Sequence, residues 1–228
     1  MDGTSLQSWA VARSMFKGCM ALPGVCKKNS PSLKPHCFES NLLSFGKRQE
    51  VVFTEENILK LHRGGWALPE FRFWIKHPFS AFERIKILRE FGNYIKVKKA
   101  NLEYLLVLLS TCVEATAVYM KFHPFCVALM RNEEGPICFF LKKNNIPLLI
   151  LSRNNNGVWH TKFELPKAEP RVKLSFTSIK AGMQSCLEQV NPYEATALGD
   201  YQVEGYLPLM DKVGYCSRIT AKELPLFI

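Results

Sequence analysis

The chain has 228 residues, of which 47% are hydrophobic and 22% are charged. This is enough apolar material for one sizeable core, and it excludes a disordered or fibrous protein. The net charge of +10 indicates an anionic partner, such as a membrane or a nucleic acid, or simply a basic solvated surface.

The first fifty residues carry the weakest signal. Thr4 is a suitable cap for a short helix that presents Leu6, Trp9 and Phe16 and ends near Pro23. We interpret residues 1–50 as an arm or linker, 51–114 as a basic helical region and 115–228 as a domain of mixed helix and strand.

The basic helical region contains a segment in which aromatic residues and cations are interleaved. From position 57 to position 99 there are ten Lys and Arg residues against three acids. The aromatic side chains could pack between helices, lie at the acyl boundary of a membrane, or stack on single-stranded nucleic acid. No nucleic-acid motif accompanies them, so we do not expect that partner. The membrane hypothesis assigns docking to Trp66, Arg72, Trp74, Lys76 and Arg84.

Further helices are expected downstream. Ser80 begins a pattern whose apolar face would hold Phe82, Ile85, Leu88 and Phe91, with a break expected at Gly92. The stretch 102–113 is nearly all apolar and predicts a buried helix. Its longest apolar run, 105–113, is bounded by acids and is shorter than the roughly 20 residues that span a bilayer.

The last third of the chain predicts strands separated by turns. The segment 125–130 is also strand-like before the turn at 132–135. Short apolar or alternating runs follow, then a helical pattern from 178 to 188, a turn at Asn191-Pro192, a short strand at 201–205 and a final amphipathic helix. The expected strands in this stretch cover 137–142, 147–153, 158–165 and 172–176.

Catalytic and metal-binding motifs are absent from the sequence. The eight cysteines form no CxxC pair, and several lie in apolar runs, which favours reduced thiols and a cytoplasmic location. Cys19, Cys26, Cys37 and His36 fit no zinc spacing, so we expect no metal and no cofactor. The histidines are scattered and the acids form no evident pair, so we expect no enzyme; a triad built on His160 or His123 would contradict this.

Three stretches near the end resemble the sterol carrier protein (type two) family. They are Leu174-Ser175-Phe176-Thr177-Ser178-Ile179-Lys180, Asn191-Pro192-Tyr193-Glu194-Ala195, and the run from Gly199-Asp200-Tyr201 through Gly205 to Leu209. In that family a strand enters a helix that ends near a polar turn, and a second strand runs through a glycine into a final helix. The resemblance covers roughly 115–222.

The resemblance implies an α+β fold with a curved, mostly antiparallel sheet of about five strands covered by helices, preceded here by a helical N-terminal region. It also implies an apolar tunnel between sheet and helices. The helical spacing in the last two helices places apolar faces where such a tunnel would lie. The alternative is that both faces complete a closed core. The candidate tunnel residues are Ile179, Met183, Leu187, Tyr206, Leu209, Met210 and Val213.

The resulting hypothesis is non-enzymatic binding or transfer of a fatty-acyl, isoprenoid or sterol-like lipid, with docking on anionic membranes through the basic aromatic segment. The alternative is an accessory or scaffold protein of a lipid or quinone biosynthetic assembly with a closed core. The protein would be cytoplasmic or attached to a membrane surface. The identity of a protein partner does not follow from the sequence.

Overall fold

A five-stranded mixed sheet and the helices that cover it form the larger half of the molecule. The computed structural model describes residues 3–22, 35–37, 43–45, 51–53, 55–62, 71–76, 78–97, 99–163, 169–187 and 192–224. The strand order is β6-β5-β4-β7-β8, and every neighbouring pair is antiparallel except β4 and β7. The fold is therefore α+β with a mostly antiparallel sheet, as predicted. The strands are β4 (Ile137–Leu141), β5 (Ile146–Arg153), β6 (Trp159–Lys162), β7 (Val172–Phe176) and β8 (Tyr201–Gly205).

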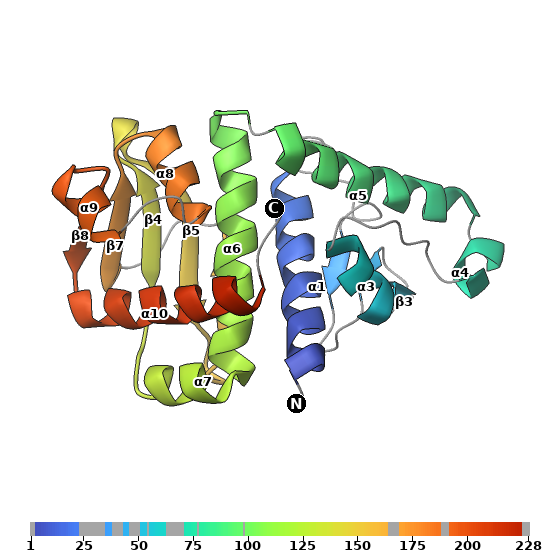
Figure 1. Ribbon diagram of the computed structural model, residues 1–228, viewed down its shortest axis with the longest axis horizontal. Coiled ribbons are helices and arrows are strands. Elements are labelled where there is room, and N and C mark those ends of the chain that lie inside the picture. The colour runs from blue at the N-terminus through green and yellow to red at the C-terminus, as the bar shows by residue number, and fades with distance from the viewer. Residues whose placement is uncertain are drawn as a thin grey trace.

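Three helices cover one face of this sheet (Figure 1). They are α6 (Leu102–Phe122), α8 (Ile179–Cys186) and α10 (Leu207–Glu223). The side chain of Asn101 caps α6 by accepting from the Tyr104 amide at 2.8 Å, and the Ser178 hydroxyl caps α8 by accepting from the Ala181 amide at 3.0 Å. Short elements complete this half: η1 (Lys143–Asn145) and α9 (Pro192–Ala197).

The strand expected at 125–130 is wrong, because these residues form helix α7 (Pro124–Met130). Pro124 occupies the first turn, where its fixed φ favours helix and its missing N–H costs nothing. Cys126 and Met130, four residues apart, are the buried positions, which is helical rather than strand spacing.

The N-terminal half begins with α1 (Gly3–Ala21), which lies lengthwise along α6 (Figure 1). The boundary predicted at residue 50 stays a prediction, although α1 buries Leu6, Val11 and Met15 in the same core as α6. The boundary predicted at 114/115 falls inside α6. The described elements that follow form a small antiparallel sheet and several helices: β1 (Pro35–Cys37), β2 (Leu43–Phe45), β3 (Val51–Phe53), α3 (Glu55–His62), α4 (Phe71–Lys76) and α5 (Pro78–Val97).

Helix α5 differs from its expected form in two respects. It continues through Gly92 to Val97, because Phe91 and Ile95 prolong its buried face beyond a glycine that costs only about 1 kcal/mol. Leu88 and Phe91 are buried as expected, but Phe82 is 67% exposed. The first turns of α5 therefore bury Ala81 in the core but leave Phe82 outside it.

Helix α6 is the core helix of the molecule. Among the described residues it is the one helix long and apolar enough to cross a membrane by length and composition, and 72% of its apolar window is buried inside the fold. Helices α1 and α5 contact it from the N-terminal half, and β5, β6, α8 and α10 contact it from the other half. Both halves of the described chain are thus built on this helix.

The contact of α1 with α6 and α5 depends on Gly18. A Cβ at this position would lie 2.2 Å from Phe91 Cε2 and 2.6 Å from Thr111 Oγ1. We expect Gly18→Ala to lower the free energy of unfolding by roughly 1–3 kcal/mol, because the buried Phe91 ring has no room to move. Urea unfolding measures the change.

The matched control is Gly92→Ala on α5, where nothing lies within 4 Å of an added Cβ. This variant should keep or raise stability by up to about 1 kcal/mol, through helix propensity alone. Similar unfolding midpoints for the two variants would show that α1 is not closely packed at Gly18.

Candidate functional site

The helix-covered face of the sheet is apolar across its middle strands. The register aligns Phe139 of β4 with Leu174 of β7, and Leu174 with Val203 of β8, so these side chains point to the same face. Phe139 and Leu174 are buried, whereas Val203 and Tyr201 on the edge strand β8 are only partly buried. Coverage by the helices therefore decreases toward β8.

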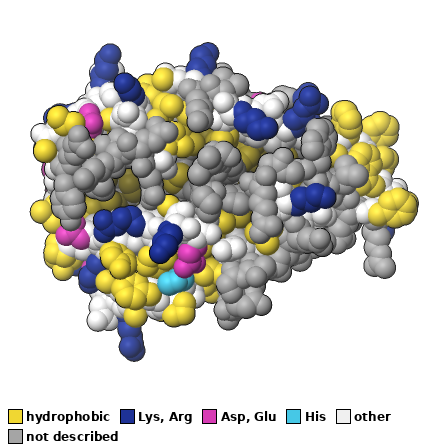
Figure 2. All heavy atoms as spheres, in the orientation of Figure 1, with side chains coloured by type: hydrophobic (Ala, Val, Ile, Leu, Met, Phe, Trp, Pro, Cys, Tyr) yellow, Lys and Arg dark blue, Asp and Glu magenta, His cyan; other side chains and the backbone are white. Residues whose placement is uncertain are grey.

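A hollow lies between α8 and α10 on this face. In the part of it that is uncovered in Figure 2, which has the orientation of Figure 1, the recessed side chains are hydrophobic. The hollow is the place where the sequence predicted an apolar tunnel.

The structure brings six of the seven candidate tunnel residues into one apolar cluster. Met183, Leu209 and Val213 are buried in the main core, and Ile179, Leu187 and Met210 are half-buried against it. Tyr206 is 41% exposed, and its ring lies 4.3 Å from Arg171 Cζ in a cation–π contact. It therefore stands at the surface, at the start of α10. The tunnel assignment itself stays a prediction.

Two close approaches hold α8 in place against α6. A Cβ on Gly182 would lie 2.8 Å from Leu105 Cδ1, so only a glycine allows α8 to approach α6 this closely. At the end of α8, the Cys112 thiol donates to the carbonyl oxygen of Cys186 at 3.5 Å. The upper border of the hollow is therefore tied to the core helix.

Helix α10 is fixed at its first turns by a glycine turn and an ionic cluster. Gly205 has φ +99°, and a Cβ there would lie 2.3 Å from the Arg171 carbonyl oxygen, so the sharp exit from β8 requires glycine. Lys212 Nζ then pairs with the buried Glu133 carboxylate at 2.5 Å, and Arg171 lies 3.7 Å from its other oxygen. The lower border of the hollow is thus anchored where α10 begins.

The far end of α10 meets α6 and α7 in a second polar cluster. His123 Nε2 lies 3.4 Å from Glu223 Oε1, and the His123 ring stacks on Tyr119 with centroids 5.7 Å apart. A hydrogen bond with Cys216, together with burial, raises the pKa of the Cys126 thiol well above its usual range. Both sulfurs are fully buried, so this arrangement offers no accessible nucleophile.

A network of buried charges joins α1, α6 and β6. Glu114 of α6 is 1% exposed, and its Oε1 accepts from Arg13 Nε at 2.9 Å and from Arg13 Nη2. Its Oε2 accepts from the Thr161 amide at 3.1 Å and from the Thr161 hydroxyl. Lys17 Nζ donates to the Thr161 carbonyl oxygen at 2.7 Å, and burial lowers the pKa of that ammonium group. These contacts connect residues far apart in sequence.

His160 lies beside this network, in an open hollow of about 490 Å³ whose other lining residues include Arg153 and Lys162. Its Nε2 is 3.5 Å from the Ser152 hydroxyl and its Nδ1 is 3.3 Å from the Val158 carbonyl oxygen. Within the described part of the chain no acid pairs with the ring, so no catalytic triad forms here. This pocket around His160 is polar and basic, unlike the apolar hollow between α8 and α10.

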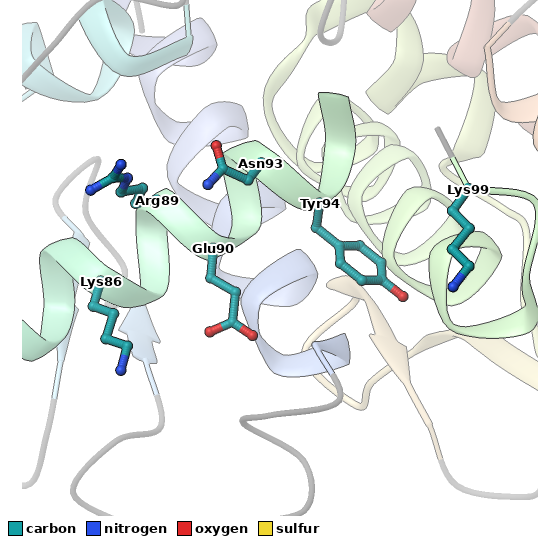
Figure 3. Close-up of a pocket in the computed structure, with 6 residues that line it drawn as sticks. All are labelled: Lys86, Arg89, Glu90, Asn93, Tyr94 and Lys99. Carbon is teal, nitrogen blue, oxygen red and sulfur yellow. The ribbon is translucent and has the colours of Figure 1, made fainter. Parts of the chain in front are cut away.

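Another open pocket, of about 510 Å³, runs along α5, and its lining is basic like that of the pocket around His160. Its lining includes three cations, Lys86, Arg89 and Lys99, against one acid, Glu90. Figure 3 shows these side chains extending from α5, with Lys99 beyond the end of the helix. Asn93 and Tyr94 complete the lining, and burial raises the pKa of the Tyr94 hydroxyl. No sequence motif marked this surface.

The five residues assigned to membrane docking fall into three groups. Trp66 lies outside the described residues, and so do the side chains of Arg72 and Arg84. Trp74 is partly buried against the core, and Lys76 is exposed. The strongly exposed apolar side chains near them are ones that the hypothesis did not name: Phe71, Ile75, Phe79 and Phe82.

No group of three or more His, Cys, Asp or Glu residues is placed to hold a metal ion in the part of the chain that the structure describes. Cys26 and the side chains of His36 and Cys37 lie outside the described residues, so the expectation that they bind no metal stays a prediction.

Comparison with protein-family models and with curated proteins finds no match. Among solved structures, the chain is similar to the sterol carrier protein domain 2 of Helicoverpa armigera, with 16% identity and a TM-score of 0.39, over 50% of this chain and 89% of that domain. It is also similar to a double mutant of the sec-alkyl sulfatase PisA1, with 10% identity and a TM-score of 0.31, over 63% of this chain and 28% of that protein. We base no argument about ligand or activity on likenesses this distant.

The element order agrees with the arrangement that the resemblance implied. Strand β7 enters α8 through the Ser178 cap, and β8 runs through Gly205 into the final helix α10. Membership of the sterol carrier protein family stays a prediction.

Replacing Glu114 by Gln tests the buried network. The change leaves the Arg13 guanidinium without its carboxylate, and we expect a loss of about 3 kcal/mol in unfolding free energy, at the lower end for buried pairs because Arg13 is 25% exposed. Glu223→Gln is the matched control, since its pair with His123 is 40% exposed on the glutamate side and should contribute less than about 1 kcal/mol. Equal losses of unfolding free energy would mean that the buried Glu114 network contributes no more to stability than the exposed pair.

His160 predicts a pH dependence of stability. Burial lowers its pKa in the folded protein, so the unfolded chain binds a proton first as the pH falls. Stability should therefore decrease below about pH 6.5, the usual pKa of histidine. His160→Gln should make the melting temperature less sensitive to pH between about pH 7.5 and about pH 5.5. An unchanged pH dependence would count against this role.

Proposed function

We propose that the protein binds a hydrophobic molecule in the hollow between α8, α10 and the sheet. The observation that supports this proposal is the apolar floor of that hollow, bordered by side chains that remain partly exposed although they pack on the core. A fatty-acyl chain, an isoprenoid or a sterol-like ring system has the matching chemistry. The proposal includes no catalytic step, metal or cofactor.

Removal of apolar surface from water would supply the affinity. Each square ångström buried contributes about 25 cal/mol, and the uncovered parts of Ile179, Met210 and Val203 gain this together with the ligand. Met183 and Met210 border the site from opposite helices. Their unbranched, polarisable side chains can repack around ligands of different shape.

A second function remains a candidate because of one observation. Met183, Leu209 and Val213 are almost completely buried, as in a core that has no room for a ligand. On this basis the domain would act as an accessory or scaffold protein of a lipid or quinone biosynthetic assembly. In either role the protein would work in the cytoplasm or at a membrane surface.

Native mass spectrometry of gently purified protein, with lipid extraction of the same sample, distinguishes the two functions. We expect a co-purifying hydrophobic molecule and saturable binding of a fluorescent long-chain fatty acid. Protein that is free of lipid and also rejects the probe would support the closed-core function instead.

Two variants test whether the probe binds in the hollow. Ile179→Asn and Met210→Asn add polar groups at half-buried positions on facing helices, and each should weaken probe binding about tenfold or more, since one apolar side chain contributes roughly 1.5–3 kcal/mol when buried. Leu198→Asn, at a position 71% exposed after α9, is the matched control and should bind normally. Equal binding by all three variants would exclude this site.

A further inference from the structure

The junction of α4 and α5 exposes four large apolar side chains. Phe71 and Ile75 are 77% and 68% exposed, one turn apart on α4, and Phe79 and Phe82 are 87% and 67% exposed on the first turns of α5. Single exposed apolar residues are ordinary, but four on two successive helices make a surface that water solvates poorly. We call these four residues the apolar tip.

The apolar tip lies at one end of the molecule. Figure 1 places α4 and the start of α5 at one end of the longest axis, with β8 and α9 at the other. Figure 2 shows hydrophobic side chains gathered at that same end. A tip in this position can enter an apolar medium, such as the surface of a membrane, before the rest of the protein touches that medium.

Cations continue the line of the apolar tip along α5. Phe79, Phe82, Lys86 and Arg89 follow one another at three- and four-residue spacing, so they share one side of the helix. Among the described side chains of α4 and α5, the cations outnumber the single acid, Glu90, by four to one: they are Lys76, Lys86, Arg89 and Lys96. The exposed side of α5 is therefore apolar at its start and cationic beyond it.

The buried side of α5 faces the core and is already covered. Ala81, Leu88, Phe91 and Ile95 lie there. The exposed side thus has its own amphipathic pattern, which the fold does not use. Apolar side chains at the acyl boundary with cations among anionic head groups are the arrangement of helices that bind membrane interfaces.

We propose that the apolar tip inserts into the surface of an anionic lipid bilayer while Lys76, Lys86 and Arg89 contact the head groups. This assigns docking to exposed phenylalanines rather than to Trp74, which is partly buried. The charge complementarity favours an anionic membrane over a second copy of this chain, because two copies would bring their cations together. The proposal does not depend on a ligand in the hollow.

The placement of the apolar tip has a consequence for orientation. The hollow between α8 and α10 lies in the other half of the molecule (Figure 1), so a bilayer that holds the tip leaves the hollow away from its surface. Docking would then tether the protein and leave the hollow free to meet a partner or a second membrane.

Co-sedimentation of the full chain with vesicles tests the proposal. We expect binding to phosphatidylcholine vesicles that contain phosphatidylglycerol, and weak binding to phosphatidylcholine alone. Phe79→Ser/Phe82→Ser should lower the partition coefficient about tenfold or more. Lys86→Gln and Arg89→Gln should each lower it about fivefold, and added salt should weaken wild-type binding.

The matched control is Leu198→Ser, which removes an exposed apolar side chain at the far end of the chain's larger half. It should bind vesicles as the wild type does, and circular dichroism should show that all variants are folded. Equal binding by wild type and Phe79→Ser/Phe82→Ser would overturn the proposal. Absence of vesicle binding, with self-association that the double substitution abolishes, would identify the surface as a contact between two copies.

Discussion

The structure depends on one buried carboxylate. Glu114 lies in the middle of an apolar helix, and an unpaired charge there would be too costly to keep. Its two oxygens are satisfied from opposite directions, one by Arg13 of α1 and the other by Thr161 of β6. Because Arg13 and Thr161 bind different oxygens of the same carboxylate, the network holds α1 along one side of α6 and the edge strand β6 along the other. Lys17 adds a contact from α1 to the same strand.

With α6 fixed in this way, the two halves of the molecule present different surfaces. On the sheet side, α8 is held against α6 through Gly182, and α10 is anchored at its start through Gly205 and Lys212. Apolar surface remains between the two helices. On the other side, α5 is held by its buried face, whereas Phe79 and Phe82 on its first turns extend away from the core. One helix therefore supports two apolar surfaces that do not overlap, the proposed ligand site and the proposed docking site.

The sheet was predictable from sequence because its signals are local. Alternating apolar residues and turn residues such as Asn154 and Gly157 mark the strands, and Gly205 marks the exit into α10. The carboxylate network was not predictable, since Arg13 and Glu114 are 101 positions apart. The sequence shows only that Glu114 directly follows an apolar run. This position indicates that the carboxylate has a buried partner, but it does not identify that partner. The exposure of Phe82 was missed for a related reason, because helical spacing shows which residues share a face but not whether anything covers it.

The position of α6 in the chain order has a consequence for synthesis on the ribosome. Its partners from the N-terminal half precede it, but β5, β6, α8 and α10 follow it. A nascent chain grows by on the order of 10 residues per second, so α6 exists for several seconds before α10 can cover it. During that interval it is a 21-residue apolar segment with the length and composition of a membrane span. The order of the elements thus leaves the apolar surface of this helix open to chaperones until the later elements cover it.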